Sequence, residues 1–168
     1  TIPGLNIISV YNKSSEAMQR MGKDAVDDGY LIGEKSDDFV LENDSKFLID
    51  WEKGQKTGFF LDQRNNRELV RQLAKNKTVL NTFCYTGGFS VTALNGGAKK
   101  VVSVDCSKKA ISDCEKNIAL NGFDIVENPS VAEDAKLYLQ NMKQGEFDLI
   151  ILDPPAFAKN HKSLHRGL

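Results

Sequence analysis

The stretch TVLNTFCYTGGFS, residues 78–90, passes from a run typical of a strand to a run typical of a helix. Residues 78–80 are β-branched or apolar, and the helix-like run SVTAL continues over 90–94. Two adjacent glycines, Gly87 and Gly88, lie in the bend between the two runs. A tight turn between a strand and a helix can hold a nucleotide or an anion. The stretch therefore predicts a ligand-binding turn, and it matches neither GxGxxG nor GxxxxGK[ST].

Segments of these two kinds alternate through the rest of the chain. Apolar, β-branched runs predict buried parallel strands at 78–83, 99–105 and 147–153, with a weaker strand near 125–132. The spacing of apolar residues predicts helices at 89–94, 107–120 and 135–142. This alternation predicts right-handed βαβ crossovers and an α/β fold built on a parallel sheet.

The first 60 residues have a different pattern, with short strand-like runs that include 6–11. The runs at 38–43 and 46–51 are separated by a turn-forming Asn-Asp-Ser sequence, which predicts a hairpin. We therefore expect a small β-rich domain or extension at 1–60. Residues 61–168 are expected to form the N-terminal part of the α/β domain.

A helix is also predicted where the two parts meet. Asn65 and Glu68 have the spacing of a capping box at its start. Leu69, Val70 and Leu73 then predict an apolar face that packs inward.

The composition fits a soluble globular protein with one core, since 40% of the 168 residues are apolar and 27% are charged. No apolar run approaches the ~20 residues of a membrane span, and no signal peptide is visible. Cys84, Cys106 and Cys114 have neither CxxC nor metal-ligand spacing, so we expect reduced thiols in a cytoplasmic protein. The net charge of −1 does not indicate a nucleic-acid binder, so RNA would need a local patch or a part outside this chain.

Ligands of a doubly wound sheet bind at the carboxyl ends of its strands. The glycine turn follows the first predicted strand, and Asp105 ends the second. Asp134 follows the weak third strand, and Asp153 with Pro154 and Pro155 follows the fourth. Three acidic residues and a glycine turn are therefore predicted to line one crevice.

The residue types at this crevice favour one nucleotide cofactor over another. A carboxylate at the position of Asp105 can accept hydrogen bonds from both ribose hydroxyls of NAD or of S-adenosylmethionine. Phe83 and Tyr85 stand where a pyrophosphate loop needs small residues, which argues against NAD. Aromatic walls suit a methionine moiety, and ring faces attract a sulfonium cation. S-adenosylmethionine is therefore the expected cofactor, with Asp134 at the adenine amino group and Asp-Pro-Pro near the methyl group.

Four stretches add a more specific indication by their order and spacing: KTGFFLDQR (56–64), LNTFCYTGGFSVTAL (80–94), VVSVDCSKKAI (101–111) and FDLIILDPPAFAKN (147–160). Together they resemble the bacterial 23S ribosomal RNA cytosine-5 methyltransferase family of class I enzymes. The resemblance covers residues 38–168. KTGFFLDQR is its most family-specific part, and DPP is shared by many methyltransferases. It implies a Rossmann-like class I methyltransferase sheet, of which this chain contains the N-terminal half.

The resemblance also implies a role for each matching position. The methionine end would contact Asp62, Gln63 and Arg64; the loop comprises Asn81, Phe83, Tyr85, Thr86, Gly87 and Gly88; the ribose and adenine would contact Asp105, Cys106, Ser107 and Asp134; the methyl group would lie beside Asp153 and Pro154. Arg64 would pair with the methionine carboxylate. Asn81 stands where many class I enzymes have Asp, and Asp153 is the candidate catalytic residue.

Methylation at carbon 5 of cytosine needs a cysteine thiolate that adds to carbon 6. The family places this cysteine in a later motif, which is expected to lie beyond Leu168. Cys84 lies in the loop, Cys106 follows the ribose carboxylate, and Cys114 falls on an apolar helix face typical of the core. None is a good substitute, so the chain is expected to bind cofactor without methylating by itself.

The basic tail AKNHKSLHRGL, residues 158–168, follows the strand at which a target base would arrive. Lys159 is a candidate phosphate contact, and Phe157 a candidate for stacking on a flipped base in ribosomal RNA. The alternatives are a solvated loop for the tail and a core position for Phe157. Nothing in the sequence indicates a membrane partner or an oligomeric state.

Three other functions stay open at this point. An exocyclic amino-group methyltransferase for adenine or guanine would use Asp-Pro-Pro and an aromatic residue without a cysteine, but here Ala156 separates Pro155 from Phe157. A fragment that binds cofactor without turnover is the second. An NAD-dependent oxidoreductase is the third, and Phe83 and Tyr85 argue against it.

Overall fold

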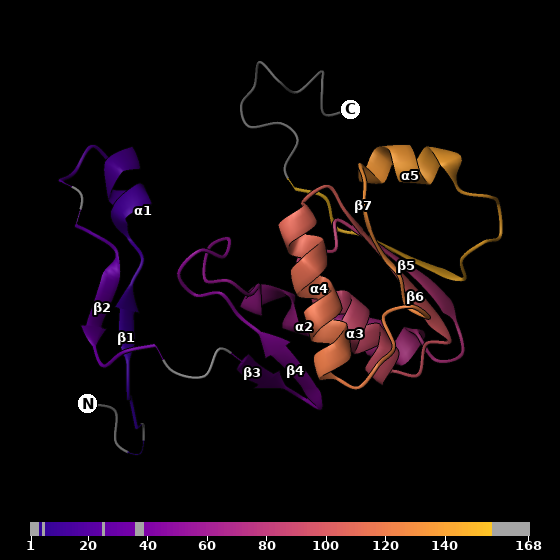
Figure 1. Ribbon diagram of the computed structural model, residues 1–168, viewed down its shortest axis with the longest axis horizontal. Helices are drawn as coiled ribbons and strands as arrows, with labels where there is room; N and C mark the ends of the chain where they lie inside the picture. The colour runs from indigo at the N-terminus through magenta and orange to yellow at the C-terminus, as the bar shows by residue number, and fades with distance from the viewer. Residues whose placement is uncertain (1–3, 5, 25, 36–38, 156–168) are drawn as a thin grey trace. The chain divides into compact units, whose positions relative to one another are not determined.

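The computed structural model describes residues 4, 6–24, 26–35 and 39–155 (Figure 1). Internal contacts divide the chain into two compact units. The smaller unit combines Thr1–Phe39 with Ile49–Phe59, and the larger combines Val40–Leu48 with Phe60–Leu168. The boundary after residue 60 that the sequence indicates stays a prediction.

The smaller unit contains β1 (Val10–Asn12), α1 (Ser15–Arg20) and β2 (Gly29–Ile32). β1 and β2 pair antiparallel, and the rings of Tyr11 and Tyr30 meet edge to face at 4.9 Å. The strand expected at residues 6–11 thus begins later, at Val10.

The larger unit is built on a four-stranded sheet of β5 (Thr78–Thr82), β6 (Lys100–Asp105), β7 (Ser130–Ala132) and β8 (Leu149–Leu152). The strand order is β7-β6-β5-β8, and all three neighbouring pairs are parallel. The predicted α/β fold with a parallel sheet is confirmed. β7 is the shortest strand of this sheet, in agreement with its weak sequence signal.

Helices cover both faces of this sheet (Figure 1). They are α3 (Gly88–Asn95) and α4 (Lys108–Leu120) on one face, and α5 (Ala135–Asn141) on the other. Successive side chains of β6 point to opposite faces of the pleated sheet. Val102 and Val104 pack with Ala135 of α5, whereas Ser103 between them hydrogen-bonds to Ser90 of α3. None of the helices in the described part of the chain is long and apolar enough to cross a bilayer.

The helix α2 (Arg64–Leu73) corrects two predictions. A 3-10 turn, η1 (Leu61–Gln63), runs directly into it, so Asn65 already lies inside the helix and the predicted capping box does not form. Leu69 and Leu73 are 54% and 48% exposed, whereas Arg67 is only 3% exposed. The inward face of α2 therefore carries a charged side chain in place of the expected leucines.

The predicted hairpin is present as β3 (Phe39–Glu42) and β4 (Ser45–Leu48), joined at Asn43 and Asp44. Asn43 has φ 53, a left-handed conformation that asparagine tolerates in tight turns. Within the larger unit, β4 contacts both α3 and α4. The hairpin is therefore packed against the helices of the sheet domain.

Candidate functional site

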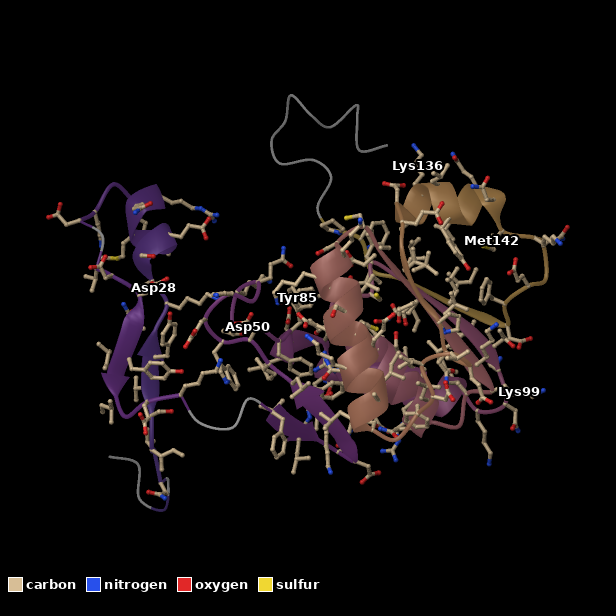
Figure 2. The ribbon with its side chains drawn as sticks, in the orientation of Figure 1. Asp28, Asp50, Tyr85, Lys99, Lys136 and Met142 are labelled. Carbon is tan, nitrogen blue, oxygen red and sulfur yellow. The ribbon has the colours of Figure 1, made fainter. Side chains whose placement is uncertain are left out.

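The carboxyl ends of the four strands meet at one edge of the sheet. β5 pairs with β6 on one side and with β8 on the other, so the chain order reverses between β5 and β8. Such a switch point is where open α/β sheets bind ligands. Tyr85 lies at this edge, and Figure 2 shows it and Lys99, which precedes β6, at opposite ends of the unit. The four predicted site segments are thus brought to the same edge.

Every second residue from Phe83 to Gly87, in the loop after β5, has a left-handed backbone conformation. The φ angles are 55 at Phe83, 49 at Tyr85 and 81 at Gly87. A left-handed non-glycine residue costs about 1–3 kcal/mol and persists where its surroundings fix it, often at functional sites. Here the N–H of Cys84 donates to Val104 at 3.0 Å, and that of Gly87 donates to the carbonyl of Cys84 at 2.9 Å. The turn is therefore held in a defined shape.

The same loop lies directly on α4. A Cβ atom added to Gly87 would stand 2.5 Å from the sulfur of Cys114, so only glycine fits without a shift. The thiol of Cys84 is buried and donates to the carbonyl of Tyr85 at 3.6 Å. The neighbouring side chain of Cys114, together with burial, raises the pKa of Cys84. Cys114 itself is 0% exposed, which confirms its predicted core position.

The carboxylate of Asp105 connects the loop to the start of α4. One oxygen accepts the N–H of Tyr85 at 3.0 Å, and the other accepts the N–H of Ser107 at 2.9 Å. Ser107 is the N-cap of α4 and accepts from Ala110, while Cys106 between them is exposed. Because a carboxylate has about four lone-pair sites, Asp105 keeps acceptor capacity for a hydroxyl ligand.

Asp134 occupies the end of β7 as the N-cap of α5. Its carboxylate accepts the N–H of Leu137 at 3.0 Å, and its side chain is exposed. One function of this residue is therefore to cap a helix, which satisfies a donor that would otherwise lack a partner. The second oxygen is available for the predicted adenine contact.

The structure brings the predicted methionine-end segment to the end of β8. The amide of Gln63 donates to Asp153 at 3.1 Å and accepts from Asn66 at 2.6 Å. Asp62 and Arg64, on either side of Gln63, are exposed.

Two predicted site residues have different surroundings from those of the rest. Asn81 is 1% exposed and donates to Ser90 at 2.8 Å, so it lies beneath the start of α3. Phe83 packs on the α5 side of the sheet and, with Leu152 and Pro154, lines a cavity of about 340 Å³. These positions place Asn81 under the loop and Phe83 on the face that α5 covers.

Three further residues that the sequence pattern did not indicate support the loop. Phe60 packs edge-on against Tyr85, with the ring centroids 5.6 Å apart. Arg67 donates to the carbonyl of Phe60 at 2.9 Å, and Asn117 donates to that of Thr86 at 2.8 Å. The sequence contains one indication of the role of Asn117, which is a polar residue within the apolar face of α4. A buried amide in such a position must form hydrogen bonds.

Phe157, Lys159 and the rest of the basic tail lie outside the described residues. Within the described part of the chain, no group of three or more His, Cys, Asp or Glu side chains is arranged to hold a metal ion. The groups described at this edge are carboxylates, amides, aromatic rings and backbone N–H and C=O groups.

Comparison with known proteins gives a consistent result. A family model for S-adenosylmethionine-dependent methyltransferases matches residues 17–167. The chain is 42% identical over 161 residues to the ribosomal RNA large subunit methyltransferase I of Tolumonas auensis, covering 93% of this chain and 41% of that protein. The protein of the same name from Aeromonas salmonicida is 42% identical over 160 residues, covering 93% and 40%. The chain thus spans about two fifths of the length of these curated relatives.

Solved structures agree with this match. A chain described as a methyltransferase in complex with SAH (S-adenosylhomocysteine) superposes with a TM-score of 0.69 at 35% identity, covering 79% of this chain and 36% of that one. A second, described as a methyltransferase dependent on S-adenosylmethionine from Streptococcus mutans, gives a TM-score of 0.70 at 32% identity, covering 83% and 40%.

Proposed function

Because the chain belongs to the family of S-adenosylmethionine-dependent methyltransferases, we propose that it is the cofactor-binding part of an RNA methyltransferase. We further propose that the substrate is large-subunit ribosomal RNA, which the names of its relatives support. The observation that carries the proposal is the convergence at one sheet edge of Asp105, the loop that it anchors, and the Gln63–Asp153 pair. An RNA substrate of this kind would place the activity in the cytoplasm.

The residues at this edge fit the cofactor chemically. S-adenosylmethionine, when bound, supplies an electrophilic methyl group. Asp105 would hold the ribose hydroxyls with its remaining lone pairs, and its backbone bonds to Tyr85 and Ser107 orient it for that role. Cys106 and Ser107 would flank the adenine. Asp134 would accept a hydrogen bond from the adenine amino group through the carboxylate oxygen that does not bond Leu137 of α5.

The remaining predicted residues would surround the methionine end and the methyl group. Thr86, Gly87 and Gly88 would form the loop wall, with Asn81 supporting it from below. Asp62 and Arg64 would face the methionine end, where the guanidinium of Arg64 would pair with a carboxylate.

For the acceptor, we propose carbon 5 of a cytosine. This carbon is a poor nucleophile unless a cysteine thiolate adds to the ring. A cysteine is reactive in this way when its thiol is accessible and the pKa of that thiol is lowered. Cys84 and Cys114 are buried, and the pKa of Cys84 is raised. Cys106 is exposed, but it follows Asp105 and would flank the adenine in this proposal. We therefore place the nucleophile in another part of a longer protein. We assign a different role to Asp153, which accepts a hydrogen bond from Gln63: this carboxylate would orient the target base.

A second candidate is methylation of an exocyclic amino group of adenine or guanine. It is favoured by the same burial of Cys84 and Cys114, because that reaction needs no thiol. Incubation of the full-length protein with large-subunit ribosomal RNA and labelled cofactor, followed by nucleoside analysis, separates the two. 5-Methylcytidine supports the first candidate, and an N-methylated purine supports the second and overturns the first.

Calorimetric titration of this chain with SAH and with NAD tests the cofactor assignment. We expect binding of SAH and not of NAD. Replacing Asp105 by Ala should weaken SAH binding by about 1.5–3 kcal/mol, because hydrogen bonds to a charged group are lost. Asp113→Ala is the matched control, since this α4 carboxylate pairs with Lys109 and Lys116 instead. Equal SAH affinity of the Asp105→Ala variant and the unchanged chain would show that the ribose assignment is wrong.

A further inference from the structure

The side chain of Asn117 joins the candidate cofactor loop to the hairpin β3–β4. It projects from α4 and is 0% exposed. Its oxygen accepts the N–H of Leu48 in β4 at 2.7 Å, and its NH2 group donates to the carbonyl of Thr86 in the loop at 2.8 Å. Both ends of a buried amide are thus used, one for the hairpin and one for the loop.

The bond to Thr86 fixes the orientation of one peptide group. The carbonyl of Thr86 and the N–H of Gly87 belong to the same planar peptide. Asn117 holds the carbonyl, and the carbonyl of Cys84 accepts the N–H at 2.9 Å. A peptide plane held at both ends cannot rotate freely, so the direction of the following backbone N–H groups depends on Asn117.

Asn121 makes the same kind of contact one helical turn later without reaching the loop carbonyl. Its oxygen accepts the N–H of Lys46 at 2.9 Å, and its NH2 group donates to the carbonyl of Lys46 at 2.7 Å. The two asparagines therefore dock α4 on the edge of β4 in parallel ways. They differ in that the donor of Asn117 is directed to Thr86, whereas that of Asn121 is directed to Lys46 and to the backbone carbonyl of Asn117 at 2.7 Å.

A second polar side chain ties the other strand of the hairpin to the site. Arg67 of α2 binds Glu42 of β3 through two hydrogen bonds of 2.6 and 2.7 Å. Its third bond, to the carbonyl of Phe60 at 2.9 Å, holds the residue whose ring packs on Tyr85. The hairpin is thus connected to the loop from two sides.

We propose that Asn117 is a positioning residue for the cofactor site: through it, the hairpin β3–β4 sets the conformation of the loop at Thr86 and Gly87. This inference rests on the proposed function, since it assumes that the loop binds S-adenosylmethionine. Asn117 touches neither cofactor nor substrate in this role. It acts by directing a peptide group, and loss of its donor should change cofactor affinity in a chain that is still folded.

The variant Asn117→Asp separates positioning from simple packing. Aspartate keeps an acceptor for the N–H of Leu48, but it places an acceptor against the carbonyl of Thr86 where a donor stood. Asn121→Asp is the matched control, because it makes the same substitution on the same helix and affects the contacts with Lys46 and with the backbone carbonyl of Asn117, leaving the side chain of Asn117 in place. If either variant fails to fold, the alanine pair Asn117→Ala and Asn121→Ala makes the same comparison without added charge.

The experiment measures urea unfolding, SAH affinity at a temperature where each variant is folded, and hydrogen exchange of the Gly87 amide. We expect both variants to be less stable. Only Asn117→Asp should bind SAH more weakly, by about tenfold, and exchange the Gly87 amide faster. A folded Asn117→Asp variant with unchanged SAH affinity would overturn the inference, as would equal weakening in Asn121→Asp.

The two proposals can fail separately. If the unchanged chain does not bind SAH, the proposed function is wrong for this chain. The exchange rate of the Gly87 amide still tests whether Asn117 positions the loop, because that measurement needs no ligand. Equal exchange rates at Gly87 in the unchanged chain and the Asn117→Asp variant would show that the hairpin does not set the loop conformation.

Discussion

The side-chain amide of Gln63 donates a hydrogen bond of 3.1 Å to the carboxylate of Asp153, although 90 residues separate them. Asn66 donates to the oxygen of the same amide at 2.6 Å, which directs the NH2 group of Gln63 toward Asp153. Two segments that are distant in sequence, KTGFFLDQR and DPP, thus meet through one bond. This bond orients the exposed carboxylate of Asp153.

This contact predicts energetic coupling in cofactor binding. In a double-mutant cycle of Gln63→Leu and Asp153→Ala, the effects on SAH affinity should differ from additivity by about 0.5–1.5 kcal/mol, the net value of one hydrogen bond. Calorimetry on the four proteins measures it. Gln72→Leu combined with Asp153→Ala is the control, because Gln72 bonds Glu68, and these two changes should be additive. Additivity in the Gln63 cycle would show that the bond does not contribute.

Replacing Gly87 by Ala should destabilise the chain strongly. The new methyl group would lie 2.5 Å from the sulfur of Cys114, and φ is 81. Overpacking costs about 1–3 kcal/mol, to which the strain of the left-handed backbone adds. Gly122→Ala is the control, since Gly122 has the same φ of 81 but nothing within 4 Å. Urea unfolding should show the larger loss at Gly87, partly relieved by Cys114→Ala; equal losses would argue against the clash.

Replacing Arg67 by Met should lower the free energy of unfolding by about 3–5 kcal/mol, because it leaves Glu42, whose side chain is only 10% exposed, without its partner. Arg71→Met, one turn along the same helix, removes ion pairs with Asp44 and Glu68, whose side chains are 75% and 39% exposed. Each of these exposed pairs should contribute about 0–1 kcal/mol. Chemical denaturation of both variants measures the difference, and similar losses would mean that burial of the Arg67 pair has no special effect.

The three thiols should differ in reactivity in the folded chain. Cys106 is exposed and should be alkylated first by iodoacetamide, whereas Cys84 and Cys114 are buried. The pKa of Cys84 is raised, so its thiol stays protonated and unreactive as the pH rises through the range in which an ordinary cysteine ionises. Mass spectrometry of peptides after timed labelling at pH 7 and 9 measures the order. Early labelling of Cys84 would contradict the described loop packing.

The fold was largely predictable because its signals are local. β-branched runs and helical spacing alternate, and each indicates its own element without reference to distant residues. The predictions failed on α2, where residues 61–63 are already helical, so Asn65 does not cap. The packing of Arg67 against Glu42 of the hairpin also placed a charged side chain where leucines were expected to face inward.

Short-range patterns in the sequence were enough to predict the parallel sheet, the glycine turn after its first strand, and the acidic residues at the strand ends. Tertiary structure decided which groups meet: Gln63 with Asp153, and Asn117 with Thr86, 31 residues away. It also decided that Phe83 packs on the α5 side of the sheet. The physical reason is that such contacts depend on how helices and strands pack in space, and the periodicity of one segment carries no information about its distant partner.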